Sequence, residues 1–369
     1  MRDRAYEGRL LAGVAADLRD RLTGQAARAN ARLGLLRPPP ARGGLVWIKS
    51  DAREGSGRLA AEIARSLRER RADLPIVVTF EYERTAIVAR LKAIANLGFA
   101  YGPADRRGAT RRILERLQPA YVVALGESMR PRLATALKAA GVPCCIVHGR
   151  PSAVCECVGF AHTASELKAW RDRTHWEAPF GALLAAAQVE PVFQGLAGAH
   201  ARALFWVTDA PQAIAVRMAR AWQASSGAAQ DILFLGSPVP GATRLSAWNE
   251  DRRPLPPGSV VWVDEERFWP ALAASCTAIH LMTPSEPLLW AVLAGGRVTS
   301  AAHVALLDLP GRPPLAEVDT NALLTYWAEL LANPDRARAA ADGLRRYFWQ
   351  QRRSAGNAAE SLVAQVCAC

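Results

Sequence analysis

Short apolar runs that alternate with helical segments are the feature that most constrains the fold of this chain. In the N-terminal half such runs lie at 45–48, 74–80, 121–127 and 142–148, and helical segments separate most of them. Runs that are apolar almost throughout, rather than at every second position, are typical of parallel strands covered on both faces. Ligands of such sheets bind beyond the carboxyl ends of the strands, so the polar residues that follow the strands are the first candidates for function.

A second set of apolar runs occupies the C-terminal half of the chain. These runs lie at 232–236, 259–264, 278–282 and 297–299, and a helical tail follows at 321–366, with breaks expected around 333–334 and Gly356. Strands that alternate with helices in both halves indicate two parallel sheets. The expected fold class is therefore α/β, with two Rossmann-like domains and C-terminal helices, which describes the GT-B architecture.

Length and charge narrow the possible partners. The chain has 369 residues, enough for two cores, and a formal net charge of +12 with only four lysines among its 46 basic residues. The charge indicates either a solvated basic surface or attraction to anions, and arginine binds phosphate and carboxylate through two parallel hydrogen bonds. Aromatic residues are not interleaved with the basic runs and no known module appears, so no nucleic-acid partner is expected.

The cysteines and the N-terminal segment carry two further expectations. Seven cysteines at irregular spacing predict reduced thiols, and Cys155-Glu156-Cys157 lacks the spacing of common zinc sites, so neither a metal nor a cofactor is expected. Residues 5–36 are expected to form a basic helix that packs on the body or lies on an anionic membrane surface. No apolar run approaches the ~20 residues that span a bilayer, and no secretory signal is evident.

Several segments resemble motifs of the Kdo transferases, the 3-deoxy-D-manno-octulosonic acid transferases. Residues 47–55 stand where that family reads W-I-H-A-x-S-x-G-E, residues 73–79 match D-L-P-x-L-V-T, and residues 101–105 match Y-x-P-x-D. Residues 126–132 are a weaker match to E-T-E-L-W-P-N, and residues 148–152 are a weaker match to N-A-R-L-S. Residues 284–295 and 301–303 correspond to the family's later motifs. The chain is similar to the family over most of its length from about residue 45 onward.

The resemblance implies a function and a domain plan. A Kdo transferase moves Kdo from CMP-Kdo to a lipid A precursor in lipopolysaccharide biosynthesis, so the implied partners are a CMP-sugar donor and an anionic lipid acceptor, with peripheral contact at the cytoplasmic face of the inner membrane. The implied domains are a basic helical segment (1–44), an acceptor domain (45–204), a nucleotide-sugar domain (205–345) and a C-terminal helix (346–369). The alternative is a degenerate, non-catalytic paralogue with a binding or scaffolding role in envelope assembly, because the family's glutamates are displaced here.

The resemblance also points to residues of the N-terminal half. The family's catalytic glutamate falls on Gly55 with Glu54 one residue early, which makes Glu54 the candidate base that deprotonates the acceptor hydroxyl. Alternatively, Glu54 simply occupies the first turn of a helix, where the helix dipole favours acids. The candidate substrate-binding residues are Arg53, Glu127, Arg130, Arg132, Arg150 and Ser152, although the arginines can equally be ordinary surface residues.

Nucleotide binding is expected in the C-terminal half. The candidates are Ser285, Glu286, Gly295, Arg297 and His303, which fall in or beside the family's later motifs. Ser285 can instead cap a helix, and Gly295-Gly296 can simply end one. His303 keeps the family's histidine, while a lone histidine can equally be structural.

Overall fold

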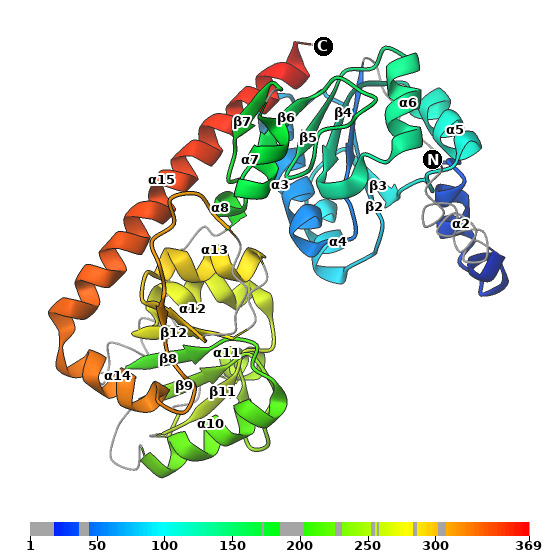
Figure 1. Cartoon of the computed structure of the whole chain (residues 1–369). Coiled ribbons are helices and arrows are strands. Elements are labelled where there is room, and N and C mark those ends of the chain that lie inside the picture. The colour runs from blue at the N-terminus through cyan, green and yellow to red at the C-terminus, as the bar shows by residue number, and fades with distance from the viewer. Residues whose placement is uncertain are drawn as a thin grey trace, which may run out of the picture. The chain divides into compact units, whose positions relative to one another are not determined.

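The computed structural model describes residues 18–36, 44–171, 173–184, 203–225, 231–251, 255–256, 258–282, 286–301 and 308–368. The chain divides into two compact units (Figure 1). Unit 1 comprises Met1–Phe180 and Ser354–Cys369, and unit 2 comprises Gly181–Arg353. The long C-terminal helix therefore belongs to unit 2 in its first part and to unit 1 in its last.

Unit 1 is built on one seven-stranded parallel sheet. Its strands are β1 (Leu45–Lys49), β2 (Ile76–Phe80), β3 (Leu97–Tyr101), β4 (Pro119–Leu125), β5 (Cys144–Val147), β6 (Val158–Ala161) and β7 (His175–Glu177), in the order β3-β2-β1-β4-β5-β6-β7. The order reverses between β1 and β4, which pair in parallel with Trp47 opposite Val122. A reversal of this kind leaves a crevice between the loops that follow the two strands.

Helices cover the sheet of unit 1. They are α2 (Ala26–Arg32), α3 (Glu54–Arg70), α4 (Thr85–Lys92), α5 (Arg107–Leu117), the short η1 (Gly126–Ser128), α6 (Pro131–Ala139) and α7 (Ala164–Trp170). Ile113 of α5 and Leu133 of α6 share a core with Trp47 and Val122, so these two helices cover the same face. The Trp47 indole donates a hydrogen bond of 2.9 Å to the buried Thr79 hydroxyl, which satisfies its polar group inside that core.

Unit 2 repeats the plan with a second seven-stranded parallel sheet. Its strands are β8 (Leu204–Val207), β9 (Ile232–Leu235), β10 (Thr243–Arg244), β11 (Val260–Trp262), β12 (Ala278–Leu281), β13 (Val298–Ser300) and β14 (Ala316–Glu317), in the order β10-β11-β9-β8-β12-β13-β14. Phe205 and Trp206 enter different core clusters, as expected for neighbouring residues of a strand buried on both faces.

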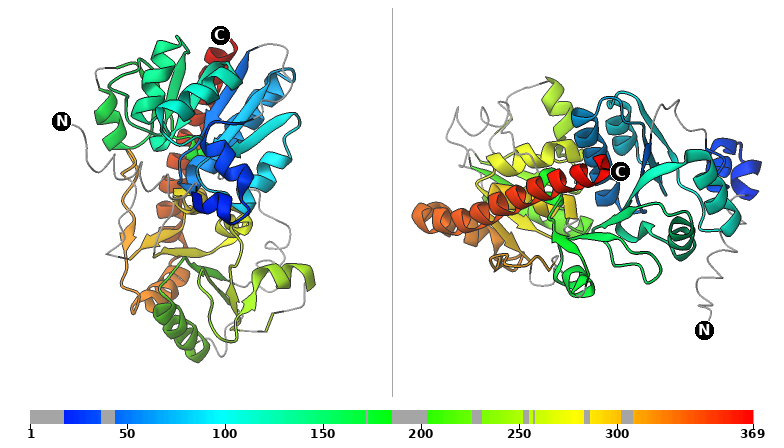
Figure 2. Two further views of the ribbon diagram at one scale, coloured as in Figure 1. Left: turned by 90° about the vertical axis from the view of Figure 1, so that its right-hand side faces the viewer. Right: turned by 90° about the horizontal axis from the view of Figure 1, so that it is seen from above.

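The helices of unit 2 are mostly short, apart from the last. They are α8 (Gly181–Leu184), α10 (Gln212–Ser225), α11 (Leu245–Asp251), η2 (Glu266–Phe268), α12 (Trp269–Ser275), α13 (Glu286–Gly295), α14 (Leu323–Ala332) and α15 (Pro334–Cys367). Helix α15, orange to red in Figure 2, runs unbroken for 34 residues. In the part of the chain that the structure describes, no helix is both long and apolar enough to cross a membrane.

The structure confirms the expected fold class and corrects two details. Two parallel sheets with helices form the expected α/β fold. The tail breaks at Asn333-Pro334 as predicted but continues as one helix through Gly356. The predicted helix at 5–36 is not continuous within its described part, because Gly24 adopts a φ of 78° and α2 begins only at Ala26.

Candidate functional site

Asp51 joins the loops that follow the two central strands of unit 1. Its buried carboxylate accepts hydrogen bonds from the Arg53 backbone amide (3.0 Å), the Arg53 Nε (2.8 Å) and the Glu127 backbone amide (3.0 Å). The Ser128 hydroxyl donates to the carbonyl of Lys49 at 2.8 Å and ties the same two loops together. These contacts fix the loops at the point where the strand order reverses, which is where an α/β sheet binds its ligand.

The loop after β5 packs against the same place. Arg53 donates a hydrogen bond of 3.2 Å from Nη2 to the carbonyl of His148. Gly126 has a φ of 63°, and a Cβ added to Gly149 would collide with the Gly126 carbonyl, so the backbones of these loops are in close contact. Arg53 and the backbone of Glu127 thus both bond to Asp51, while the Glu127 side chain is exposed to solvent.

A cluster that contains two basic side chains lies beside these loops. Lys49, the last residue of β1, is buried, and its Nζ is 3.7 Å from Oε1 of Glu81. Arg130 reaches the same Oε1 at 3.3 Å. Burial lowers the pKa of Lys49, and the carboxylate of Glu81 opposes that effect. Asp105 and Asp51 also act on Lys49, so the half-buried Arg130 is the cation of this cluster that suits an anionic group of a substrate.

We expect Lys49→Met to stabilise the protein at neutral pH by about 1 kcal/mol, because burial of the ammonium group outweighs its charge interactions with Glu81, Asp105 and Asp51. Arg130 still pairs with Glu81, so that carboxylate is not left alone. The pKa of Lys49 is lower in the folded than in the unfolded chain. At pH values between these two pKa values the unfolded chain binds more protons, so the contribution of Lys49 to the free energy of unfolding rises with pH in that range. Urea unfolding at pH 7 and at pH 10 measures both effects.

Lys92→Met is the matched control, because Lys92 is exposed on α4. It should change the free energy of unfolding by less than about 0.5 kcal/mol at either pH. The advantage of Lys49→Met over the wild type should shrink between pH 7 and pH 10. Destabilisation by Lys49→Met at both pH values would show that the ammonium group stabilises the fold.

A histidine pair forms the far side of the loop after β5. His148 has a φ of 52°, and its Nε2 lies 2.7 Å from the carbonyl of Ala178. Its ring stacks on that of His162 with centroids 3.7 Å apart, and Nδ1 of His162 lies 3.0 Å from Oε2 of Glu166. Burial raises the pKa of Glu166, but its hydrogen bond and charge interaction with His162 outweigh burial and hold that pKa below the ordinary value. The cluster fixes the backbone to which Arg53 is bonded.

The remaining candidates of unit 1 differ in their surroundings. Arg132 is half-buried in the first turn of α6, where its backbone amide donates to Asp105 at 3.4 Å. Arg150 follows β5 and is exposed. The Ser152 hydroxyl accepts hydrogen bonds of 3.2 Å from the backbone amides of Val154 and Cys155, so its position is set by a turn. Glu54 begins α3, and its side chain lies outside the described part of the structure.

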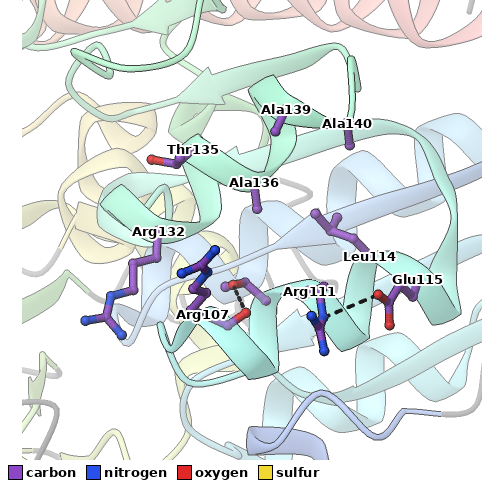
Figure 3. Close-up of a pocket in the computed structure, with 10 residues that line it drawn as sticks. Arg107, Arg111, Leu114, Glu115, Arg132, Thr135, Ala136, Ala139 and Ala140 are labelled. Atoms are coloured by element: carbon purple, nitrogen blue, oxygen red, sulfur yellow. Dashed lines mark hydrogen bonds and ion pairs between the residues drawn. The ribbon is translucent and has the colours of Figure 1, made fainter.

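A pocket of about 830 Å³ lies between α5 and α6. Figure 3 shows Arg107 and Arg132 at one end and Leu114 and Ala140 at the other. Helix α5 follows β3, and helix α6 follows β4 and η1. The amino ends of both helices therefore lie at the same edge of the sheet as Lys49 and Arg130. The pocket is therefore basic at the end nearest the crevice loops and largely apolar along its length.

Unit 2 has polar residues at the equivalent place in its own sheet. The Thr208 hydroxyl, after β8, accepts a hydrogen bond of 3.0 Å from the backbone amide of Met282, after β12. These two strands adjoin where the strand order reverses. The Ser237 hydroxyl, after β9, donates to the carbonyl of Ala210 at 2.5 Å, and burial raises the pKa of Asp209 beside it. Sequence reasoning missed all of these residues.

The structure describes only some of the predicted nucleotide-binding residues. Ser285 and His303 lie outside the described residues, as does the side chain of Glu286, the first residue of α13. Gly295 ends α13, and its carbonyl accepts a hydrogen bond of 3.1 Å from Arg345. Arg297 directly precedes β13 and donates to the carbonyl of Thr277 at 3.5 Å. Gly295 and Arg297 therefore lie at the amino end of β13, opposite the edge that carries Thr208.

Among the residues that the structure describes, no group of three or more His, Cys, Asp or Glu side chains is arranged to hold a metal ion.

Comparisons with known proteins agree with the fold. Residues 27–154 match the family model described as 3-deoxy-D-manno-octulosonic-acid transferase (kdotransferase), which confirms the resemblance for that segment. No curated protein sequence gives a significant match. The UDP-GlcNAc 2-epimerase of Neisseria meningitidis bound to UDP-GlcNAc is similar in structure, with 10% identity, 88% of this chain and 100% of that chain covered, and a TM-score of 0.54.

Two further structures, one of them a glycosyltransferase, SnogD, are similar to the same extent. SnogD from Streptomyces nogalater has 14% identity, covers 88% of this chain and 100% of its own, and gives a TM-score of 0.50. MurG of Acinetobacter baumannii has 10% identity, covers 89% and 100%, and gives 0.52. At these identities the likeness establishes the two-domain GT-B fold. The family match and the fold together support a glycosyltransferase.

Proposed function

We propose that this protein transfers Kdo from CMP-Kdo to an anionic lipid acceptor, a lipid A precursor, in lipopolysaccharide biosynthesis. The observation that carries the proposal is the family match over residues 27–154, because that segment contains the loops joined by Asp51. Unit 1 then binds the acceptor and unit 2 the nucleotide. The domain plan of an acceptor domain at 45–204 and a nucleotide-sugar domain at 205–345 remains part of this proposal.

The chemistry assigns roles to the residues of unit 1. Glu54 is the proposed base that removes the proton from the attacking hydroxyl. Arg130 supplies positive charge that can hold a substrate carboxylate or phosphate, the buried Lys49 adds to the positive potential beside it, and Arg53 and Glu127 belong to the loops joined by Asp51. Arg132 and Arg150 complete a basic rim at the same edge of the sheet.

The nucleotide site is proposed at the reversal point of the unit 2 sheet. Ser285 and Glu286 follow β12 in sequence, and His303 follows β13. Met282, also after β12, donates its backbone amide to Thr208. Hydroxyl groups and the amino end of α13 are suitable donors to the phosphate of CMP. The surroundings of Gly295 and Arg297 instead favour a role in joining α13 to β13.

The pocket between α5 and α6 suits the lipid part of the acceptor. Its apolar length can accept an acyl chain, while Arg107 and Arg132 lie at the end where a phosphorylated sugar would sit (Figure 3). Peripheral contact with the cytoplasmic face of the inner membrane is part of the proposal. The helical residues before α2 support it, since Leu18 and Leu22 are 59% and 79% exposed and Arg19 and Arg21 lie between them in sequence.

Incubation of the protein with CMP-Kdo and a tetraacylated lipid A precursor tests the proposal directly. Mass spectrometry should detect the acceptor with added Kdo, together with released CMP. The same acceptor without its phosphates should react about 10- to 100-fold more slowly, because a charge-assisted hydrogen bond contributes about 1.5–3 kcal/mol. The absence of both product and donor hydrolysis at every enzyme concentration would refute Kdo transfer.

A non-catalytic role is the second candidate, and one observation favours it. The first glutamate of the family's E-T-E motif falls on Gly126, whose φ of 63° and lack of space for a Cβ exclude a side chain at that position. Such a protein would bind CMP-Kdo or the lipid without turning either over. Saturable binding of both ligands by calorimetry, with no product in the assay above, would establish the binding role.

A further inference from the structure

One side of α15 carries a stripe of arginines within unit 2. Residues that are three, four or seven positions apart lie on the same side of an α-helix. This spacing relates five arginines and one tryptophan of α15, which together form the basic face: Arg338, Arg345, Arg346, Trp349, Arg352 and Arg353. The other side of the helix contributes Leu344, Tyr347 and Phe348 to the hydrophobic core of unit 2. The helix is therefore amphipathic here, and its polar side is strongly basic.

Trp349 lies in the middle of the basic face and is open to solvent. Its side chain is 56% exposed, and Arg346 and Arg353 are exposed about one turn before and after it. The Cζ of Arg352 lies 5.4 Å from the centroid of the Trp349 ring, and the ring of Phe348 meets it edge to face at 5.5 Å. The indole is thus held by neighbours on its own helix and leaves much of its apolar surface uncovered.

The acidic residues near the basic face are confined to its first turns. Asp335 and Asp342 lie there, and residues 343–359 contain no acidic residue. Within the part of the chain that the structure describes, the only ion pair of the basic face joins Arg338 to Asp335 at 3.2 Å. Arg346 donates its Nε hydrogen bond of 3.3 Å to a backbone carbonyl, that of Asp342. The arginines around Trp349 therefore keep their positive charge available to an outside partner.

A further arginine of unit 2 lies close to the basic face. Burial lowers the pKa of Arg297, the charges of Arg345 and Arg338 lower it further, and Asp342 opposes them. The Nε of Arg345 donates a hydrogen bond of 3.1 Å to the carbonyl of Gly295, which fixes its guanidinium beside this group. Like charges gathered in this way repel one another, and a surface of negative charge relieves that repulsion.

We propose that the basic face of α15 is a membrane-contact surface of unit 2 that binds the anionic headgroups of a lipid bilayer. Guanidinium groups bind phosphate through parallel hydrogen bonds, and the negative surface potential of an anionic leaflet attracts each of them. Tryptophan prefers the level of the headgroups, where its ring is partly in apolar surroundings and its N–H stays hydrated.

The shape of the basic face favours a bilayer over a nucleic acid. The face extends over 15 helical steps, roughly 22 Å at 1.5 Å per residue, along a single helix. Such a line of contacts fits a flat surface. A single-stranded nucleic acid is bound instead by several aromatic side chains on which successive bases stack, and the basic face has one.

This inference rests on the peripheral membrane contact of the proposed function and extends it from unit 1 to unit 2. Its test contains neither CMP-Kdo nor a lipid A precursor. A negative result would therefore remove this surface and leave Kdo transfer to be decided by the transfer assay.

Cosedimentation of the whole protein with vesicles tests the surface. Phosphatidylcholine vesicles that contain phosphatidylglycerol should bind the wild type more tightly than vesicles of phosphatidylcholine alone, and high salt should release it. Arg346→Gln/Arg353→Gln should bind the anionic vesicles about 20- to 30-fold more weakly, because each arginine near such a surface contributes about a fivefold gain. Trp349→Ala should weaken binding about fivefold through the loss of apolar ring surface from the interface.

Arg217→Gln/Arg220→Gln is the matched control. Arg217 and Arg220 are exposed on α10 of unit 2, so this variant loses the same charge from the same unit and leaves the basic face intact. It should weaken vesicle binding less than about twofold. Equal weakening by the two double variants would overturn the proposal, because net charge alone would then account for binding. Loss of duplex DNA binding with unchanged vesicle binding in Arg346→Gln/Arg353→Gln would also overturn it and assign the face to nucleic acid.

Discussion

Replacing Gly126 by alanine is expected to lower the transfer rate about 100-fold and the free energy of unfolding by about 3 kcal/mol. The backbone at Gly126 has a φ of 63°, a conformation that costs an L residue roughly 1–2 kcal/mol. The new methyl group would also overlap the guanidinium of Arg53 and the carboxylate of Asp51. Relief of such overpacking costs about 1–3 kcal/mol more.

The loss of activity follows from where the collision occurs. Asp51 holds both Arg53 and the backbone of Glu127, so a shift of its carboxylate moves the loops after β1 and β4 together. A displacement of about 1 Å in a positioning group can lower a rate about 100-fold. Initial rates with CMP-Kdo and the lipid A precursor, together with urea unfolding, measure the two effects.

Gly141→Ala provides a matched control. Gly141 has the same φ of 63°, but a Cβ added there would meet no atom within 4 Å. This variant should lose roughly 1–2 kcal/mol of stability from the backbone conformation alone and keep its transfer rate. Equal losses of activity in Gly126→Ala and Gly141→Ala would mean that the loop contacts of Asp51 do not govern the site.

Most strands that could be predicted from sequence are buried on both faces, although the equally buried β8 was missed. The strand β1 consists of five buried residues, and its apolar run was evident without a structure. The strand β3 (Leu97–Tyr101) went unrecognised because it lies at the sheet edge, where all five residues are only half-buried and include a glycine. Edge strands carry a weaker hydrophobic signal, so their detection depends on pairing with a neighbour, here β2.

The site was harder to predict because its residues act through long-range contacts. Arg53, Glu127 and Arg130 could be chosen because they follow strands that were recognised. Asp51 lies in the same loop, yet its importance depends on the amide of Glu127, 76 residues away in sequence. Lys49 ends an otherwise apolar strand, and only burial and the proximity of Glu81 distinguish it from a surface lysine.

Glu54→Gln is expected to reduce kcat about 100- to 10,000-fold, the usual contribution of a general base. The backbone of Glu54 is well positioned for this role because it directly follows Arg53, which is bonded to Asp51 and to the carbonyl of His148. Glutamine keeps the shape of the side chain but cannot accept the proton of the acceptor hydroxyl. The KM for CMP-Kdo should change less than about twofold if the nucleotide binds to unit 2.

Glu69→Gln is the matched control for this prediction, since Glu69 is exposed on the same helix and pairs only with Arg65 among the described residues. It should keep the wild-type kcat, and both variants should unfold within about 0.5 kcal/mol of the wild type. If Glu54→Gln retains the wild-type kcat, Glu54 is only an acid in the first turn of α3, and the base must be sought elsewhere at this edge of the sheet. If the unmodified protein transfers Kdo and only Glu54→Gln fails, the glutamate one residue early performs the role of the family's displaced base.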